Sequence, residues 1–378
     1  MAGIYIHIPF CRQACHYCDF HFSTNISRKT EMVNAILDEI SLQNNYLEGE
    51  IIRTIYFGGG TPSLLNSNEI EHLIKGIQSN FNISSDPEIT LEANPDDLST
   101  TKLSELNNAG INRLSIGVQS FYESHLSYLN RVHSRKEALD CIAKAQNKGF
   151  KNISIDLIYG IPHQDHSIWE KDLKTTIELE VPHISSYCLT IEEKTVFGNW
   201  LRKGIIKQVE DDYAAEQHEI MVDTFEHAGY EHYEVSNFSK PGMHSRHNSS
   251  YWKREKYLGV GPGAHSFNGR TRQYNIANNS IYLKSLKENR VPFSLEELTR
   301  VDAINEEILT RMRTKWGLGI SYLKDKYNYD IMSDKKAMVD EMLGKDLIFK
   351  KDNILYLTKS GKLLADHIAS ELFIDDEN

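Results

Sequence analysis

A repeated alternation of short apolar runs and amphipathic stretches is the feature that most constrains the fold of this chain. In the first half of the sequence, six apolar or β-branched runs each lead through a turn into a segment of helical periodicity. Consecutive strand and helix units of this kind predict parallel strands in a barrel or an open sheet, with functional loops at the carboxyl ends of the strands. The expected strands are Ile4–Ile8, Thr54–Phe57, Glu88–Ala93, Arg113–Val118, Ser154–Tyr159 and His183–Leu189.

The clearest helix is expected over residues 135–148. Ser134 and Glu137 have the spacing of a capping box, and Gly149 can end the helix in the left-handed conformation. After residue 189 the pattern changes to a helix near 211–227 and then to a stretch rich in glycine and aromatic residues. We therefore expect three parts, which are an α/β unit over 1–200, a connecting region over 201–292 and a C-terminal domain over 293–378.

The C-terminal part has a different order of elements. Helices are expected near 302–314, 319–327 and 334–343, followed by a hairpin at 347–358 and a last helix. This order resembles a winged-helix α+β domain. Its 12 basic and 15 acidic residues between 301 and 378 argue against DNA binding, so we expect a packing or lid role.

The overall charge and hydrophobicity exclude several classes of protein. With 42 basic and 53 acidic residues, the net charge of −11 argues against a general affinity for nucleic acid or anionic membranes. No apolar run approaches the ~18 residues of a membrane span, and the first ten residues lack the features of a signal peptide. We expect a cytoplasmic protein with no integral membrane segment and no nucleic-acid partner.

Three of the five cysteines, Cys11, Cys15 and Cys18, follow the first expected strand directly. They are too close together for a disulfide framework, and their spacing suits three thiolates around one inorganic centre. A [4Fe-4S] cluster would then keep one iron without a protein ligand. Alternatives are a zinc site with His16 or His21 as the fourth ligand, and unliganded structural thiols. The remaining cysteines, at 141 and 188, are expected to be buried core thiols.

Polar residues stand where several of the other expected strands end. The Gly58–Gly60 run follows the second strand, and glycines there allow a ligand to approach the backbone. Glu92 and Gln119 end the third and fourth strands. Asp156 lies within an apolar strand, so it must face a polar interior or a partner, and a buried bridge to Arg131 is the structural alternative.

The CxxxCxxC segment, the preceding Tyr-x-His-Ile-Pro-Phe and the GGGTP motif together resemble the radical S-adenosylmethionine (SAM) superfamily, in its oxygen-independent coproporphyrinogen III oxidase-like branch. The resemblance covers nearly the whole chain and implies a partial (β/α)6 barrel with a C-terminal winged-helix-like domain. It also implies that Cys11, Cys15 and Cys18 bind a [4Fe-4S] cluster and that SAM occupies the open iron, where an electron from the cluster cleaves it. Tyr17 is expected near the adenine of SAM. The SAM contacts that the resemblance implies are Tyr5, Gly60, Thr61, Glu92, Gln119, Arg131 and Asp156.

Two features depart from the oxidase pattern. The oxidases carry a further cysteine two residues after the third ligand, where this chain has Phe20, and they have a longer segment before the cluster, whose first ligand here is residue 11. Oxidative decarboxylation of the propionates of coproporphyrinogen III therefore stays the alternative function. Whether SAM is cleaved in function, and whether the chain forms a homodimer, are left open.

Residues 247–252 read His-Asn-Ser-Ser-Tyr-Trp. This HNxxYW motif resembles the signature of HemW-type haem chaperones, which implies haem as a further cofactor and delivery of haem to recipients such as respiratory enzymes. The resemblance implies that His247, Tyr251 and Trp252 contact haem, since an imidazole can ligate iron and aromatic rings can stack on a macrocycle. His265, in Gly-Pro-Gly-Ala-His-Ser, is a second candidate for the iron, and packing in a tight turn is its structural alternative.

Three basic residues surround the HNxxYW motif in the sequence. We expect them to neutralise the haem propionates, because guanidinium and ammonium groups bind carboxylates well. They are Arg246, Lys253 and Arg254.

Overall fold

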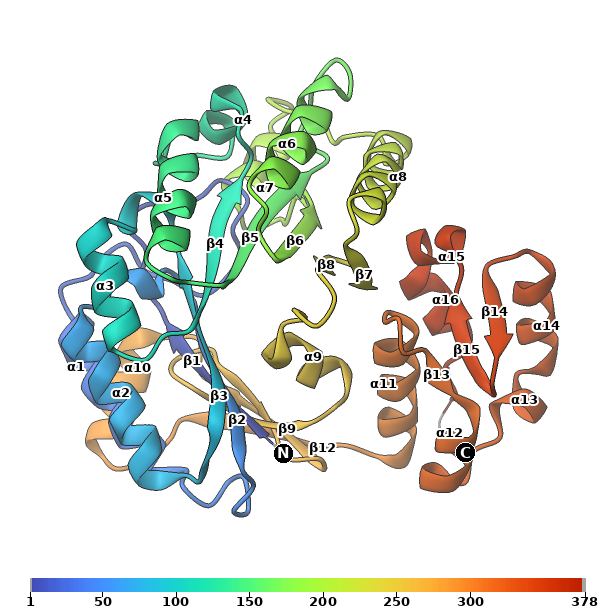
Figure 1. Cartoon of the computed structure of the whole chain (residues 1–378). Coiled ribbons are helices and arrows are strands. Elements are labelled where there is room, and N and C mark those ends of the chain that lie inside the picture. Colours follow the sequence, from blue (N-terminus) through green and yellow to red (C-terminus); the bar gives the residue numbers. More distant parts are fainter. Residues whose placement is uncertain (1, 376–378) are drawn as a thin grey trace.

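The six expected strands form one parallel sheet in the computed structural model, which describes residues 2–375 (Figure 1). Neighbours in the chain are neighbours in the sheet, and every pair from first to sixth is parallel. The parallel α/β prediction is confirmed, and the sheet is open rather than closed. The strands are β1 (Ala2–Ile8), β2 (Ile52–Gly59), β3 (Ile83–Ala93), β4 (Arg113–Gln119), β5 (Asn152–Tyr159) and β6 (His183–Cys188).

Helices follow each of the first five strands and bury their apolar faces against the sheet (Figure 1). In α5 the predicted capping box is present, with Ser134 and Glu137 each bonding the other's backbone amide. Gly149 follows this helix with φ +86°, as expected of a left-handed terminus. The helices are α1 (Lys29–Leu42), α2 (Ser67–Asn80), α3 (Thr100–Asn108), α4 (Glu123–Tyr128), α5 (Arg135–Asn147) and α6 (Ser167–Glu178), with 3₁₀ turns at Pro62–Leu64 and Pro95–Asp97.

Residues 196–297 add strands to both ends of this sheet, although the sequence indicates only a connecting region over 201–292. At one end β8 and β7 pair antiparallel beside β6, and at the other β9 pairs parallel with β1. The sheet continues through β10, β11 and β12 to twelve strands. The added elements are α7 (Val196–Arg202), α8 (Asp211–His227), β7 (Glu231–Glu234), β8 (Asn237–Ser239), α9 (Arg246–Trp252), β9 (Lys256–Val260), β10 (His265–Phe267), β11 (Thr271–Asn275), α10 (Asn279–Lys287) and β12 (Phe293–Glu297).

Buried polar residues on the parallel strands form the surface that receives α9. Thr54, Arg113 and His183 are each at most 3% exposed. The first turn of α9 is anchored there, because the amides of Arg246 and His247 donate to the Glu88 carboxylate at 3.1 and 3.0 Å. In Figure 1, α9 lies between the parallel strands and α11 (Arg300–Met312), and it contacts both. The motif-bearing helix is thus part of the interior of the molecule.

The C-terminal elements enclose a second hydrophobic core of their own. The expected hairpin is present as β14 and β15, which pair with β13 in a separate antiparallel sheet. No helix among residues 2–375 is long and apolar enough to cross a membrane. After α11 the elements are β13 (Leu318–Gly319), α12 (Ile320–Tyr327), α13 (Ile331–Asp334), α14 (Lys336–Gly344), β14 (Ile348–Lys351), β15 (Ile354–Leu357), α15 (Lys359–Leu363) and α16 (Ala365–Glu371).

Candidate functional site

The cysteine loop leaves the carboxyl end of β1 and is closed at its base by backbone hydrogen bonds. The amide of Cys11 donates to the carbonyl of Ser23 at 3.1 Å, and the amide of Ser23 donates to the carbonyl of Pro9 at 2.9 Å. Cys11, Cys15 and Cys18 lie on this loop, and each is partly exposed. One short, closed loop therefore presents all three thiols.

Side chains from two other loops donate hydrogen bonds to the cysteine sulfurs. The Thr61 hydroxyl lies 3.4 Å from Cys11 Sγ, and Arg131 Nη1 lies 3.3 Å from Cys15 Sγ. Burial raises the pKa of Cys11, and it raises the pKa of Cys18 to about 12. Because thiolates are the metal-binding form, such thiols ionise when a metal takes the proton's place. The sulfur donors therefore fit a positively charged inorganic group.

The zinc alternative requires a fourth ligand, and in the described part of the chain each candidate histidine has one ring nitrogen hydrogen-bonded and the other free to bind a metal. His16 Nδ1 lies 2.9 Å from the carbonyl of Tyr128, and His21 Nε2 lies 2.8 Å from Asn279 Oδ1. Within residues 2–375, no three His, Cys, Asp or Glu side chains converge as the ligands of one metal ion do. A four-iron cluster places each thiolate on a different iron, so its ligands stand farther apart. This geometry favours the cluster.

The glycine run packs directly against the cysteine loop. A Cβ on Gly60 would lie 2.5 Å from the carbonyl oxygen of Phe10 and 2.8 Å from that of Ile8. Gly59 has φ +106°, and a Cβ there would lie 2.6 Å from the His7 ring. The amide of Gly60 donates to the carbonyl of Ile8 at 2.9 Å. Glycine is therefore required at these positions to bring the second loop onto the first.

Glu92, at the carboxyl end of β3, is held by groups from β2. Tyr56 donates its hydroxyl proton to the carboxylate at 2.8 Å, and the amide of Gly59 donates at 3.2 Å. Burial is the main cause that raises the pKa of Glu92 to about 7. A buried carboxylate with this pKa gains from a hydroxyl or cationic partner.

Asn94 links the glycine loop to Arg131. Its side-chain amide lies 3.4 Å from Thr61 Oγ1, and its Oδ1 accepts from Arg131 Nη2 at 2.6 Å. Arg131 also donates to the carbonyl of Gly117 at 2.7 Å. Gln119 stands beside this group with φ +68°, where the register of β4 against β5 shifts. In the sequence Asn94 is simply the residue before Pro95, and nothing there indicates its bridging role.

Asp156 occupies a buried polar position on β5. The Ser115 hydroxyl donates to it at 3.2 Å, and burial raises its pKa to about 6 although the charge of Arg113 opposes this. In the part of the chain that the structure describes, no ion pair joins Asp156 to Arg131, whose hydrogen bonds go elsewhere. Arg113, only 1% exposed, was not singled out from the sequence, although a charge at the start of an apolar strand is a usable signal.

The two tyrosines in the sequence prediction lie in different surroundings. Tyr17 packs with a small apolar cluster around Phe197, next to the cysteine loop. Tyr5 stacks on Tyr56 with ring centroids 6.1 Å apart, and its hydroxyl lies 3.2 Å from His7 Nδ1. Tyr5 also lines a large cavity. In the sheet, β1 lies between β2, which leads into the glycine loop, and β9, and the cavity is on the β9 side.

His247 is buried, with 1% of its surface exposed, and both of its ring nitrogens are engaged. Nδ1 lies 2.7 Å from Thr54 Oγ1, and Nε2 lies 2.8 Å from the Tyr251 hydroxyl. The ring also stacks on Tyr56 at a centroid distance of 4.9 Å. In this arrangement His247 has no nitrogen free for iron, and it fixes the position of Tyr251.

A cavity of about 530 Å³ opens beside the C-terminal half of α9. Its walls are mostly aromatic, and it reaches from the end of the cysteine loop to β9, β10 and α11. Tyr251 and Trp252 of the HNxxYW motif line it, whereas His247 does not. The lining residues are Tyr5, His7, Phe20, His21, Tyr251, Trp252, Arg254, Glu255, Tyr257, Gly263, His265, Phe267, Arg272, Ala277 and Thr310.

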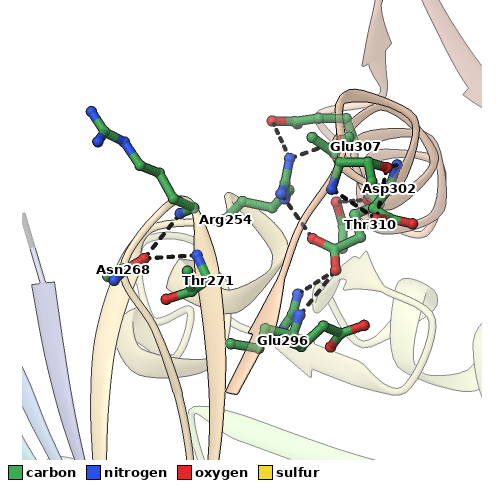
Figure 2. Close-up of polar contacts among 12 residues, drawn as sticks. Arg254, Asn268, Thr271, Glu296, Asp302, Glu307 and Thr310 are labelled. Atoms are coloured by element: carbon green, nitrogen blue, oxygen red, sulfur yellow. Dashed lines mark hydrogen bonds and ion pairs between the residues drawn. The ribbon is translucent and has the colours of Figure 1, made fainter.

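Arg254 joins the cavity to the C-terminal domain, as Figure 2 shows for its contact with Glu307. Its side chain is 5% exposed and lies 2.8 Å from Glu306 and 3.5 Å from Glu307. It also donates to the carbonyl of Ala303 and to the Tyr327 hydroxyl at 2.8 and 2.9 Å. Both terminal nitrogens of the Arg254 guanidinium are therefore engaged by α11 and α12, and a propionate would have to compete with these contacts.

The other two basic residues near the motif also have partners, but they are more exposed. Arg246 lies 3.4 Å from Asp86, at the end of α9 away from Trp252. Lys253 is exposed, with its ammonium 4.7 Å from the ring centroid of Trp316. Arg272, which sequence analysis did not single out, lines the cavity and pairs with Glu306 at 2.7 Å.

The two cysteines outside the loop differ in exposure. Cys141 is buried in α5, as predicted. Cys188 is exposed, so the prediction of a core thiol there is wrong. The reason is that β6 is buried only over its first four residues, and Cys188 lies past them at the carboxyl end.

Comparison with known proteins agrees with these features. Residues 5–175 match the model of the radical SAM superfamily, and residues 298–364 match that of the HemN C-terminal domain. The chain is 37% identical to "Heme chaperone HemW" of Bacillus subtilis, covering 97% of this chain and 98% of that one. It is 33% identical to the protein of the same name from Lactococcus lactis, covering 99% and 98%.

A solved structure of coproporphyrinogen III oxidase (HemN) from Escherichia coli superimposes with a TM-score of 0.85. The match covers 98% of this chain and 90% of that chain, at 22% identity, and it shows the shared fold alone. The relatives from Bacillus and Lactococcus are similar over nearly their whole length. The chain therefore belongs to the HemW heme chaperone family of the radical SAM superfamily.

Proposed function

We propose that this protein is a cytoplasmic haem chaperone that binds haem in the aromatic cavity and delivers it to haem proteins such as respiratory enzymes. The names of the relatives support haem as the cargo. The observation that carries the proposal is that Tyr251 and Trp252 line a cavity of about 530 Å³. A flat apolar macrocycle gains most from walls of this kind, because aromatic rings stack on it and exclude water.

Segments other than α9 give the cavity further aromatic surface. Tyr257 and Phe267 come from β9 and β10, and Phe20 comes from the cysteine loop. Phe20 is 68% exposed, which is unusual for a phenylalanine and leaves its ring available to a ligand. Rings from three separate segments can therefore enclose a bound macrocycle on more than one side.

Positive charge at the cavity suits the propionates of haem. Arg272 lies in the wall, with its guanidinium 5.1 Å from the Phe267 ring centroid, and Lys253 is exposed next to Trp252. Arg272 shares Glu306 with Arg254, and Arg254 also pairs with Glu307. If a propionate bound Arg272, Glu306 would keep Arg254 as its partner, so neither charge would be left unpaired.

The radical SAM family implies a [4Fe-4S] cluster and SAM. We propose that Cys11, Cys15 and Cys18 hold the cluster, which when bound supplies one-electron chemistry to SAM. Gly60 and Thr61 bring backbone and hydroxyl groups to the cysteine loop, and the other residues expected to contact SAM all have polar side chains. These are Tyr5, Glu92, Gln119, Arg131 and Asp156.

Two variants test whether the cavity lined by Tyr251 and Trp252 binds haem. Trp252→Ala should weaken haem binding, measured by titrating haem into anaerobically reconstituted protein and following the absorbance. Phe349→Ala, an exposed aromatic on the C-terminal hairpin, is the matched control and should bind as the wild type does. Transfer to an apo-haem protein should follow the same order.

The alternative function is tested in the same preparation. Coproporphyrinogen III supplied with SAM and a reductant should yield no protoporphyrinogen, in line with Phe20 in place of a cysteine. Measured turnover, or a wild-type protein that binds no haem, would overturn the chaperone proposal.

A further inference from the structure

We propose that His265 supplies the axial ligand to haem iron, and that His247 of the motif positions the cavity wall. The inference rests on the proposed function and makes it specific. The imidazoles of His7, His21 and His265 line the cavity, and that of His247 does not.

The three imidazoles differ in the nitrogens that they leave free. His7 is buried, with Nδ1 3.2 Å from the Tyr5 hydroxyl and Nε2 2.9 Å from the carbonyl of His21. His21 has Nε2 bonded to Asn279. His265 is exposed, and its ring forms no hydrogen bond within residues 2–375. Among these three imidazoles in the described part of the chain, it is thus the one whose two ring nitrogens are both free of hydrogen bonds, so it can bind a metal through either.

The backbone around His265 holds the side chain at a defined place. Gly261 and Gly263 have φ values of +101° and +81°, and they turn the chain into β10. The amide of Asn275 donates to the carbonyl of Ala264 at 2.9 Å. The His265 ring stands edge-on to Tyr274 with a centroid distance of 4.7 Å. Because the backbone already fixes His265 at the start of a strand, little conformational entropy is lost when its side chain binds iron.

Two kinds of surface line the cavity, an imidazole from one element and aromatic rings from another. His265 projects from β10, whereas Tyr251 and Trp252 belong to α9. Haem between these elements would place an imidazole nitrogen on one face and aromatic rings on the other. Nitrogen ligation and ring stacking are compatible in this arrangement because they use opposite faces.

His247 acts through its neighbours. It ties Thr54 of β2 to the Tyr251 hydroxyl and stacks on Tyr56. A Cβ on Gly3 would lie 3.2 Å from its ring, so the space around it is filled. Loss of this imidazole should move Tyr251 and loosen haem, but it should leave the iron ligand unchanged.

Spectroscopy of ferric haem complexes separates these roles. His265→Ala should lose the imidazole-ligand signature in the electron paramagnetic resonance and Soret spectra, and haem affinity should fall at least about tenfold. Added imidazole should restore the signature in this variant. His247→Gln should bind haem more weakly and keep the wild-type signature. His367→Ala, an exposed histidine of α16, is the control and should match the wild type.

The failures are distinguishable. If the wild type binds no haem, the proposed function itself fails. If haem binds and His265→Ala keeps the wild-type signature, the ligand assignment fails while the chaperone function stands. Loss of the signature in His247→Gln or in His21→Ala, with His265→Ala unaffected, would assign the iron to that residue instead and overturn the inference.

Discussion

Arg254→Met is the substitution for which the structure predicts the most specific loss of stability. The guanidinium is almost fully buried between the end of α9 and α11, and it contacts two carboxylates, a carbonyl and a hydroxyl. Methionine keeps much of the volume of the side chain and removes its charge and donors. The change therefore isolates the polar link between the main sheet and the C-terminal domain.

The size of the expected loss of stability depends on which partners Glu306 and Glu307 keep after the substitution. Removing one partner of a buried ion pair costs about 3–5 kcal/mol when the other charge is left alone. Here Glu307 keeps Arg311 at 3.2 Å and Lys326 at 3.1 Å, and Glu306 keeps Arg272 at 2.7 Å. We therefore expect a loss below that range, about 2–3 kcal/mol in the free energy of unfolding.

Urea unfolding of the full apo chain, followed by circular dichroism and tryptophan fluorescence, measures this loss. Arg254→Lys should recover part of it, because the charge returns without the forked geometry. Arg28→Met removes an exposed ion pair with Glu31 and should have no measurable effect. An Arg254→Met protein within about 0.5 kcal/mol of the wild type, the usual range for surface changes, would refute the reasoning.

Three further predictions concern other parts of the chain. Gly60→Ala should abolish iron incorporation, because its Cβ would lie 2.5 Å from a carbonyl of the cysteine loop, while Gly344→Ala, with open space around it, should reconstitute normally in an iron and sulfide assay. Burial raises the pKa of Glu39 from 4.5 to about 7, so the folded chain holds the proton more tightly and stability should fall as the pH rises between these values. Glu39→Gln should flatten that slope in thermal melts, and an unchanged slope would contradict the assignment. In the native apo chain, iodoacetamide should modify Cys188 and spare Cys141, as peptide mass spectrometry would show, and equal labelling would be the contrary result.

Local signals in the sequence predicted the local structure well. The parallel strands appear where apolar runs were expected, and the capping box at Ser134 is formed as its spacing predicts. The helix of residues 211–227 also has the expected bounds. Each of these features depends on contacts between residues near each other in the chain, so periodicity and capping are sufficient to find them.

Contacts between distant segments were not predictable in the same way. The pairing of β9 with β1 joins residues 256–260 to residues 2–6 and leaves no local pattern. The HNxxYW motif gives the residue types at these positions. It does not reveal that the two ring nitrogens of His247 are hydrogen-bonded to Thr54 and Tyr251. Arg254 likewise looks available in the sequence and is buried by α11. The cluster and SAM contacts stay predictions, supported by the gathering of Thr61 and Arg131 at the cysteine sulfurs.

The position of β9 has a consequence for how the chain matures. During synthesis β1 leaves the ribosome well before β9, the strand that covers one of its edges, which follows about 250 residues later. At the usual pace of translation this is a delay of roughly 10 to 50 s. Throughout that interval the strand that leads into the cysteine loop has an unpaired backbone edge. The cysteine loop and the aromatic cavity therefore reach their finished form in the same late event, so a nascent chain acquires both together.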